Sequence, residues 1–393
     1  MTAQPDRPSV TVGELYAGYA CDESVRAGAS SGGIVSAVLI HLLQAGHDGA
    51  LVSRIAADGA TVAVTNVARS VEEVLDHAGS SYIDSPVLGT IDRLCESGAL
   101  AGRRYAVVAL PCQVRALRNR FLRRPELNKA LNPIIGLFCR GNVKPVFYDD
   151  LLAREGIDPA RVRSVRVRRG HVKGCVELSL SDGRQRRLAF GHLNAYRILG
   201  VHAKDLCAWC DEHLADQADL SVGDIFLPEF KKLPIKHSAF VARNAAAAAL
   251  AQTLIDEGRI TCCRVGMDEY RRRFRRMERF SNDLASRRLA ARLVGRKAPR
   301  GKLPGRFSIF RCLAWTIIFL HGRMSQRRWQ GAVCMPCPGG GSAPGHLRSR
   351  PCRVSKSFGY GESPVERTSG RLCHLRRLAD RQPRRGVDAG KRH

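Results

Sequence analysis

Two apolar segments that each run into a cysteine, together with a Cys-x-x-Cys pair further along the chain, constrain the fold more than any other feature. Residues 105–110 precede Pro111 and Cys112, and residues 134–138 run directly into Cys139. Unbroken apolar runs of this length are typical of parallel strands that are covered on both faces. Parallel strands deliver their carboxyl ends to one edge of a sheet, so we expect the two cysteines to lie together at that edge.

The Cys-x-x-Cys pair consists of Cys207 and Cys210, and this spacing places two sulfur atoms on one turn. Four thiolates around one centre suit zinc and an iron–sulfur cluster about equally well. The spacing alone leaves both open, and Cys112 and Cys139 could also be ordinary buried cysteines. If all four bind one cluster, their sulfur atoms must lie within roughly 7 Å of one another.

The periodicity of the remaining chain predicts an α/β fold. We expect an N-terminal mixed sheet flanked by helices, an inserted antiparallel sheet and a C-terminal helical segment. Apolar residues recur at helical spacing from Ile34, whereas residues 162–169 alternate valine with arginine and serine, as a half-exposed strand does. Residues 238–243 are predicted to be the last strand, and residues 268–298 are predicted to form one charged helix.

Small residues open the first long helix and recur in a later turn. The first group is Ser30, Ser31, Gly32 and Gly33, and the second is residues 79–82. Free N–H groups at a helix start can hold a phosphate or the edge of a flavin. Ordinary capping of the helix by Ser30 or Ser31 is the alternative, and without further information it is favoured.

Composition limits the class of protein. The chain has 393 residues, 14 cysteines and a formal net charge of +28. Its first residues lack the apolar core of a secretory signal, and no run approaches the roughly 20 apolar residues of a membrane span. We therefore expect a cytoplasmic protein with reduced or metal-bound cysteines. Most of the positive charge lies after residue 267, where it argues only weakly for nucleic-acid binding.

Five motifs, taken in order, resemble the coenzyme F420 hydrogenase/dehydrogenase beta-subunit family. The resemblance covers residues 14–290. The motifs are Ser-Ser-Gly-Gly at 30–33, Gly-Ser-Ser-Tyr at 79–82, Val-Val-Ala-Leu-Pro-Cys-Gln at 107–113, Gly-Leu-Phe-Cys at 136–139, and the Cys-x-x-Cys followed by Ala-Asp-Leu-Ser-Val-Gly-Asp at 218–224.

The resemblance implies a flavin- and iron–sulfur-dependent oxidoreductase. Its cofactors would be FAD, a 4Fe-4S cluster and, as in several family members, coenzyme F420. The cluster ligands would be Cys112, Cys139, Cys207 and Cys210. The implied flavin contacts are Ser30, Ser31, Gly32, Gly33, Gly79, Ser80, Tyr82 and Lys173. No catalytic acid or base stands out.

The resemblance also implies partners and a division of the chain. Residues 1–150 would form the flavin-binding α/β domain, and residues 151–300 an antiparallel-sheet and iron–sulfur domain. Electrons would be exchanged with ferredoxin or a partner redox subunit, and a small molecule would accept hydride. The chain could also form a homo-oligomer. Two alternatives stay open: a non-catalytic electron-transfer subunit that docks through residues 268–298, and a zinc-stabilised protein that binds nucleic acid.

Two further groups of residues have an undecided role. Residues 301–393 form a basic tail, rich in Gly, Pro, Ser, Arg and Cys from residue 331, which we expect to be disordered or read out of frame. A set of basic side chains around the expected antiparallel sheet could face an anionic cofactor or solvent. These are Arg166, Arg168, Arg169, Lys173, Arg186 and Arg187.

Overall fold

The structure is a computed structural model, and it describes residues 8–57, 61–170, 174–273, 283–299 and 305–326. The chain divides into a unit over residues 1–329 and a second unit over residues 330–393. The second unit lies wholly outside the described residues, and so does the expected basic tail after residue 326.

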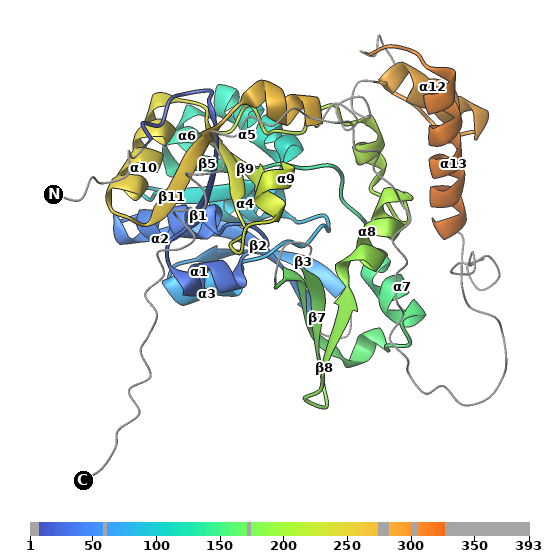
Figure 1. Ribbon diagram of the computed structural model, residues 1–393, viewed down its shortest axis with the longest axis horizontal. Helices are drawn as coiled ribbons and strands as arrows, with labels where there is room; N and C mark the ends of the chain where they lie inside the picture. Colours follow the sequence, from blue (N-terminus) through green and yellow to red (C-terminus); the bar gives the residue numbers. More distant parts are fainter. Residues whose placement is uncertain (1–7, 58–60, 171–173, 274–282, 300–304, 327–393) are drawn as a thin grey trace. The chain divides into compact units, whose positions relative to one another are not determined.

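An eight-stranded mixed sheet forms the body of the first unit (Figure 1). Strands β2, β4, β5 and β9 are parallel neighbours, and the other four pair antiparallel. The strand order is β11-β1-β10-β9-β5-β4-β2-β3. The bounds are β1 Leu15–Ala20, β2 Gly49–Ala57, β3 Thr61–Ala68, β4 Tyr105–Ala109, β5 Leu131–Leu137, β9 Leu220–Asp224, β10 Ser238–Ala242 and β11 Ile260–Val265.

Helices cover both faces of this sheet, which explains the unbroken apolar strands. One face packs on α2 Ile34–Gln44, α3 Val71–Asp76 and α10 Ala245–Asp256. The other face packs on α4 Val87–Glu96, α5 Pro111–Arg123 and α6 Pro125–Ala130. The helix α1 Glu23–Gly28 and the short α9 Pro228–Lys231 lie on the connections.

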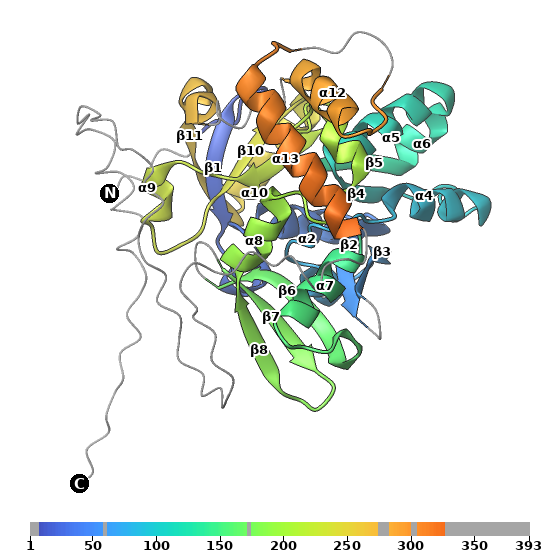
Figure 2. The same cartoon turned by 90° about the vertical axis from the view of Figure 1, so that its right-hand side faces the viewer.

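A three-stranded antiparallel sheet is inserted between β5 and β9 (Figures 1 and 2). It contains β6 Val162–Arg169, β7 Cys175–Leu180 and β8 Gln185–Ala189. Its apolar face packs on α7 Val146–Arg154 and α8 Phe190–Ile198. The expected mixed sheet with an inserted antiparallel sheet is confirmed. The large sheet takes strands from both sides of residue 150, and the domain boundary expected there stays a prediction.

A helical hairpin, α12 Leu284–Leu293 and α13 Ile309–Gln326, follows the large sheet. The expected single helix over residues 268–298 is wrong: residues 267–273 are helical, and α12 ends before Gly295, whose φ is 67°. Part of the expected basic tail is folded, since α13 lies within it. Strand β10 is also not the last strand, because β11 follows and pairs with β1. Within the described residues, no helix combines the length and apolarity that crossing a bilayer requires.

Candidate functional site

Four cysteines meet at the carboxyl edge of the parallel strands. Cys112 lies in the first turn of α5 after β4, and Cys139 lies two residues after β5. Cys207 and Cys210 lie on and just after a 3-10 turn, Asp205–Trp209, that precedes β9. Because β4, β5 and β9 are neighbours, their connections bring the cysteines together. The charges of Cys207, Cys112 and Cys210 all act on Cys139, so the four thiols lie in one neighbourhood.

This arrangement makes the thiolate forms unfavourable in the absence of a cation. Burial, followed by the charges of the other three cysteines, raises the pKa of Cys139 to about 12. Burial also raises the pKa of Cys112, Cys207 and Cys210. At Cys112 the effect of burial on the pKa outweighs that of the backbone N–H groups at the start of α5. A bound metal centre would supply the missing positive charge.

Backbone amides already point at two of the sulfur atoms. The N–H of Gly141 donates to Sγ of Cys139 over 3.5 Å, and that of Asn142 donates to Sγ of Cys207 over 3.3 Å. Hydrogen bonds of this kind accompany iron–sulfur clusters and tune their potentials. Lys204 adds a positive charge that lowers the pKa of Cys112 and Cys207 against the effect of burial.

The segment from Cys139 to Asn142 is held at both ends by hydrogen bonds to its backbone. The backbone N–H of Cys139 donates to the carbonyl of His213 over 3.0 Å, and the ring of His213 lies 2.7 Å from the carbonyl of Cys139. The N–H of Lys204 donates to the carbonyl of Asn142 over 2.9 Å. Among the described residues, no three His, Cys, Asp or Glu side chains are arranged to hold a single metal ion.

The Ser-Ser-Gly-Gly segment packs against β1, the start of β10 and β6. The residue that caps α2 is Gly33, and it provides no side-chain cap, so capping by Ser30 or Ser31 is wrong. Instead, the hydroxyl of Ser31 donates to the carbonyl of His237 over 2.7 Å, and that of Ser30 donates to the carbonyl of Val167 over 3.3 Å. Gly32 lies so close to β1 that a Cβ atom would sit 2.4 Å from the carbonyl oxygen of Gly18.

The second small-residue turn meets the first at β6. Ser80 forms a bridge with Val167, the residue that also binds Ser30. Tyr82 has a φ of 55°, and its ring lies 4.8 Å from the Arg197 guanidinium. The structure thus brings Ser30 and Ser80 together, as the implied flavin contacts require. Lys173 lies outside the described residues.

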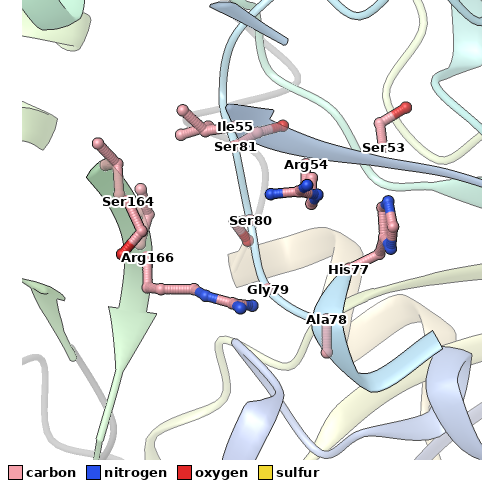
Figure 3. Close-up of a pocket in the computed structure, with 12 residues that line it drawn as sticks. Ser53, Arg54, Ile55, His77, Ala78, Gly79, Ser80, Ser81, Ser164 and Arg166 are labelled. Carbon is pink, nitrogen blue, oxygen red and sulfur yellow. The ribbon is translucent and has the colours of Figure 1, made fainter. Parts of the chain in front are cut away.

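A small cavity marks this junction (Figure 3). Its volume is about 40 Å³, whereas pockets for drug-sized ligands begin at roughly 300 Å³. Arg166 extends from β6 toward residues 78 and 79 in Figure 3 and forms a 2.5 Å ion pair with Asp76. The walls come from β2, β6 and the connection that follows α3. The lining residues are Ser53, Arg54, Ile55, His77, Ala78, Gly79, Ser80, Ser81, Ser164, Val165, Arg166 and Val167.

The arginines of the small sheet are engaged by carboxylates. Arg168 forms an ion pair with Asp224 at the end of β9. Glu177 lies 3.8 Å from Arg169 and 2.8 Å from Arg187. Arg168 therefore joins the two sheets, whereas Glu177 neutralises Arg169 and Arg187 within the small sheet. Arg186 is exposed.

Sequence reasoning missed two residues beside the Ser-Ser-Gly-Gly segment. Lys236 donates to the carbonyl of Ala29 over 2.8 Å, and burial together with Arg168 lowers its pKa to about 8. Burial lowers the pKa of His237 to about 4. Both residues precede β10, more than 200 positions after Ser31. No local pattern marks them, because only the sheet topology brings them to this place.

One connection joins the two halves of the candidate site. Its beginning, Gly79 and Ser80, lies against β6, and its end lies against the cysteines. The side-chain amide of Asn142 donates to the carbonyl of Ile83 over 3.1 Å, and Lys204 forms a 2.5 Å ion pair with Asp84. The junction of Ser30 and Ser80 on β6 and the four cysteines are therefore linked by a single short stretch of chain.

Comparison with known proteins supports the fold and the family. Residues 15–92 match the family model of the coenzyme F420 hydrogenase/dehydrogenase beta subunit, N-terminal part, and residues 102–266 match the C-terminal part. A chain of the F420-reducing NiFe hydrogenase complex from Methanosarcina barkeri superposes with a TM-score of 0.56 at 17% identity. The match covers 75% of this chain and 99% of that chain, and it shows the fold alone.

Curated relatives match about half of the chain. The coenzyme F420-dependent sulfite reductase of Methanocaldococcus jannaschii is 28% identical over 213 residues, which is 50% of this chain and 31% of that protein. The coenzyme F420 hydrogenase subunit beta of Methanococcus voltae is 28% identical over 217 residues, 53% of this chain and 71% of that subunit. The chain belongs to the coenzyme F420 hydrogenase/dehydrogenase beta-subunit family.

Proposed function

We propose that this protein is a flavin- and 4Fe-4S-dependent oxidoreductase that passes electrons between an iron–sulfur donor, FAD and a hydride acceptor. The observation that carries the proposal is the convergence of Cys112, Cys139, Cys207 and Cys210. A second supporting observation is that Ser30 and Ser80 both contact Val167 of β6. The names of the relatives make coenzyme F420 the first acceptor to test.

Each part of the chain has a definite task in this proposal. The four thiolates would hold the cluster, and the amides of Gly141 and Asn142 would stabilise their charge. The start of α2, which has no side-chain cap, would offer its N–H groups to the flavin. When bound, the cluster supplies single electrons and the flavin converts them to hydride equivalents.

The cavity at the junction is too small for a flavin, so the proposal requires a change there on binding. The small sheet contacts the large one through ion pairs, one backbone bridge and the buried side chains of Ile55 and Ala57 in β2. We propose that the connection over residues 79–84 shifts to admit the flavin ring while its far end stays against the cysteines.

A second candidate is a non-catalytic electron-transfer subunit of a larger complex. Two relatives are named as subunits of a hydrogenase and of a formate dehydrogenase, which favours an assembly of this kind. In that role the chain would still bind both cofactors, and turnover would need another subunit. Expected partners are ferredoxin or a partner redox subunit, and a homo-oligomer is a further possibility to measure.

The deciding experiment is anaerobic purification of the full chain with analysis of iron, acid-labile sulfide and flavin. We expect about four irons and one flavin per chain, with brown absorbance. Turnover with coenzyme F420 or reduced ferredoxin by the isolated chain would favour the enzyme over the subunit. A colourless protein that contains only zinc would overturn the proposal and favour the zinc-stabilised alternative.

The flavin contacts need their own test. In Ser31→Leu the larger side chain replaces the hydroxyl that binds His237, and in Gly33→Val a branched side chain is placed at a φ of 84°. We expect both variants to lose flavin while keeping iron. Retention of stoichiometric flavin in folded variants would remove these residues from the site.

A further inference from the structure

The hairpin of α12 and α13 packs on the turn that carries Cys207 and Cys210. Its apolar core contains Cys312 and Phe319, and Ala208 and Trp209 from the Cys-x-x-Cys turn pack against it. The hairpin lies outside the residues that match the family models, which end at residue 266. The hairpin therefore forms one wall of the cysteine site.

One charged residue of this wall is almost completely buried. The side chain of Arg287, on α12, is 4% exposed, and its Nη1 donates to the carbonyl of Ala208 over 2.8 Å. Its guanidinium lies 4.2 Å from the centre of the Trp315 ring. A guanidinium hydrogen-bonded to Ala208 is held beside the Cys-x-x-Cys turn, and the charge of Cys210 acts on it.

Arg287 is a cation in this position. Burial lowers its pKa to about 10, while Asp283, Cys210 and Asp211 act in the opposite direction through their charges. The side chain therefore stays protonated at neutral pH. Asp283, which is 1% exposed, lies 3.9 Å from Arg287 and 3.3 Å from Arg311, so its carboxylate is shared between two arginines.

We propose that Arg287 is a positioning residue of the cysteine site, which holds the Cys-x-x-Cys turn and raises the reduction potential of the centre bound there. This inference rests on the proposed function in that a redox cluster occupies the four cysteines. Reduction adds one electron and breaks no bond, so the centre becomes more negative by one charge. A buried positive charge beside it favours the reduced form.

The burial of Arg287 makes its effect distinct from that of surface charges. Salt screens charges in water, but it has little influence on a buried pair. Arg115 is a natural contrast, because it lies 3.7 Å from Asp211 on the solvent side and is 46% exposed. We expect its influence on the same centre to fade at high salt.

The experiment measures the midpoint potential of the cluster in the full-length protein by optical titration with dithionite. In Arg287→Met the packing against Trp315 is kept and the charge is lost. We expect the equilibrium for one-electron reduction to fall at least tenfold, which is a shift of about 59 mV to lower potential. The shift should persist at high salt. The Arg287→Lys variant should restore most of the wild-type midpoint potential.

The matched control is Arg323→Met. Arg323 donates to the carbonyl of Val294 over 2.7 Å and so joins the same two helices. The Arg323→Met variant should leave the midpoint potential of the cluster unchanged. A wild-type potential in a fully iron-loaded Arg287→Met protein would overturn the inference, and so would equal shifts in both variants. A wild-type chain that binds no iron would instead overturn the proposed function.

Loss of the cluster in Arg287→Met is also informative. If Arg287→Lys then keeps iron at the wild-type potential, the positive charge is needed even for binding, which supports the inference. If both variants lose iron while Arg323→Met keeps it, the role is one of packing, and the assignment of a charge effect is overturned.

Discussion

The four clustered cysteines come from three separate segments of the chain, yet we expect them to act as one unit. A cluster that loses one thiolate is left open and labile. Changing Cys112, Cys139, Cys207 or Cys210 singly to Ala should therefore remove most of the bound iron and bleach the visible absorbance. Iron and sulfide assays on the anaerobically purified variants measure this.

Cys175 and Cys262 serve as matched controls. Cys175 lies on β7 of the small sheet, and Cys262 packs into the core beside α2 and α10. Their Ala variants should keep wild-type iron. Iron retained in any variant of the four clustered cysteines would separate that residue from the ligand set.

His237 gives the protein a pH-dependent stability. Its folded pKa of about 4 lies below the ordinary value of 6.5, because burial disfavours the charged ring. Between these values the unfolded chain binds the extra proton, so stability falls as pH falls from about 6.5 to about 4. From pH 7 to pH 5 the free energy of unfolding should drop by about 2 kcal/mol from this residue.

Urea unfolding of the wild type and His237→Gln at both pH values checks this prediction. The variant should lose about that much of the pH dependence, although its stability at pH 7 will also change. His192→Gln is the control, since His192 is exposed and pairs with Glu155. An unchanged pH dependence in His237→Gln would mean that His237 is not buried as described.

At the scale of single elements, the start of α2 is fixed by a close approach of two backbones. A Cβ on Gly32 would lie 2.4 Å from the carbonyl oxygen of Gly18 and 2.6 Å from the backbone nitrogen of Ser238. Gly32→Ala should therefore destabilise the protein by about 1 to 3 kcal/mol through overpacking. Thermal or urea unfolding measures the loss.

Gly89→Ala is the opposite case on another helix. Gly89 lies inside α4, and nothing approaches its ideal Cβ within 4 Å. Alanine is the better helix former, so this variant should gain up to about 1 kcal/mol. Equal effects of the two substitutions would contradict the close packing at Gly32.

Elements with strong local patterns could be predicted from the sequence, and those defined by distant contacts could not. The alternation of valine with arginine and serine predicted β6 with its correct ends, and helical spacing from Ile34 predicted α2. Strand β11 was missed because Cys262 and Cys263 face opposite layers and give no alternation of apolar and polar residues. The start of α12 at Leu284 was missed because arginines recur throughout the charged segment.

In the candidate site, too, residues marked by a local pattern could be predicted and residues placed by distant contacts could not. The four cysteines could be grouped from strand ends and a Cys-x-x-Cys spacing, because both are local signals. Lys236, His237 and Arg287 could not, since each reaches its place through contacts with residues far away in the sequence.

At the scale of the whole molecule, the two sheets are joined by the Arg168–Asp224 pair. Burial alone would lower the pKa of Arg168, but Asp224 and Tyr82 raise it, so the arginine stays charged. A double-mutant cycle with Arg168→Met and Asp224→Asn should give a coupling of about 1 to 3 kcal/mol. Amide exchange over β6–β8 should also become faster in Arg168→Met.

The exposed pair of Arg187 and Glu177 provides the comparison within the same sheet. The side chain of Arg187 is 76% exposed, so its coupling should stay below about 1 kcal/mol. If the two cycles give the same value, the Arg168–Asp224 contact does not hold the sheets together.

The position of β1 between β10 and β11 has a consequence for the synthesis of the protein. Ser31 binds His237, which lies 206 residues later in the chain. At ordinary translation rates the ribosome needs on the order of 10 to 40 s to make that stretch. During this time β1 and the Ser-Ser-Gly-Gly segment cannot pair with β10, β11 or His237, because those residues have not yet been synthesised. The nascent chain thus carries an unpaired apolar strand that a chaperone, or another copy on the same messenger RNA, can bind first.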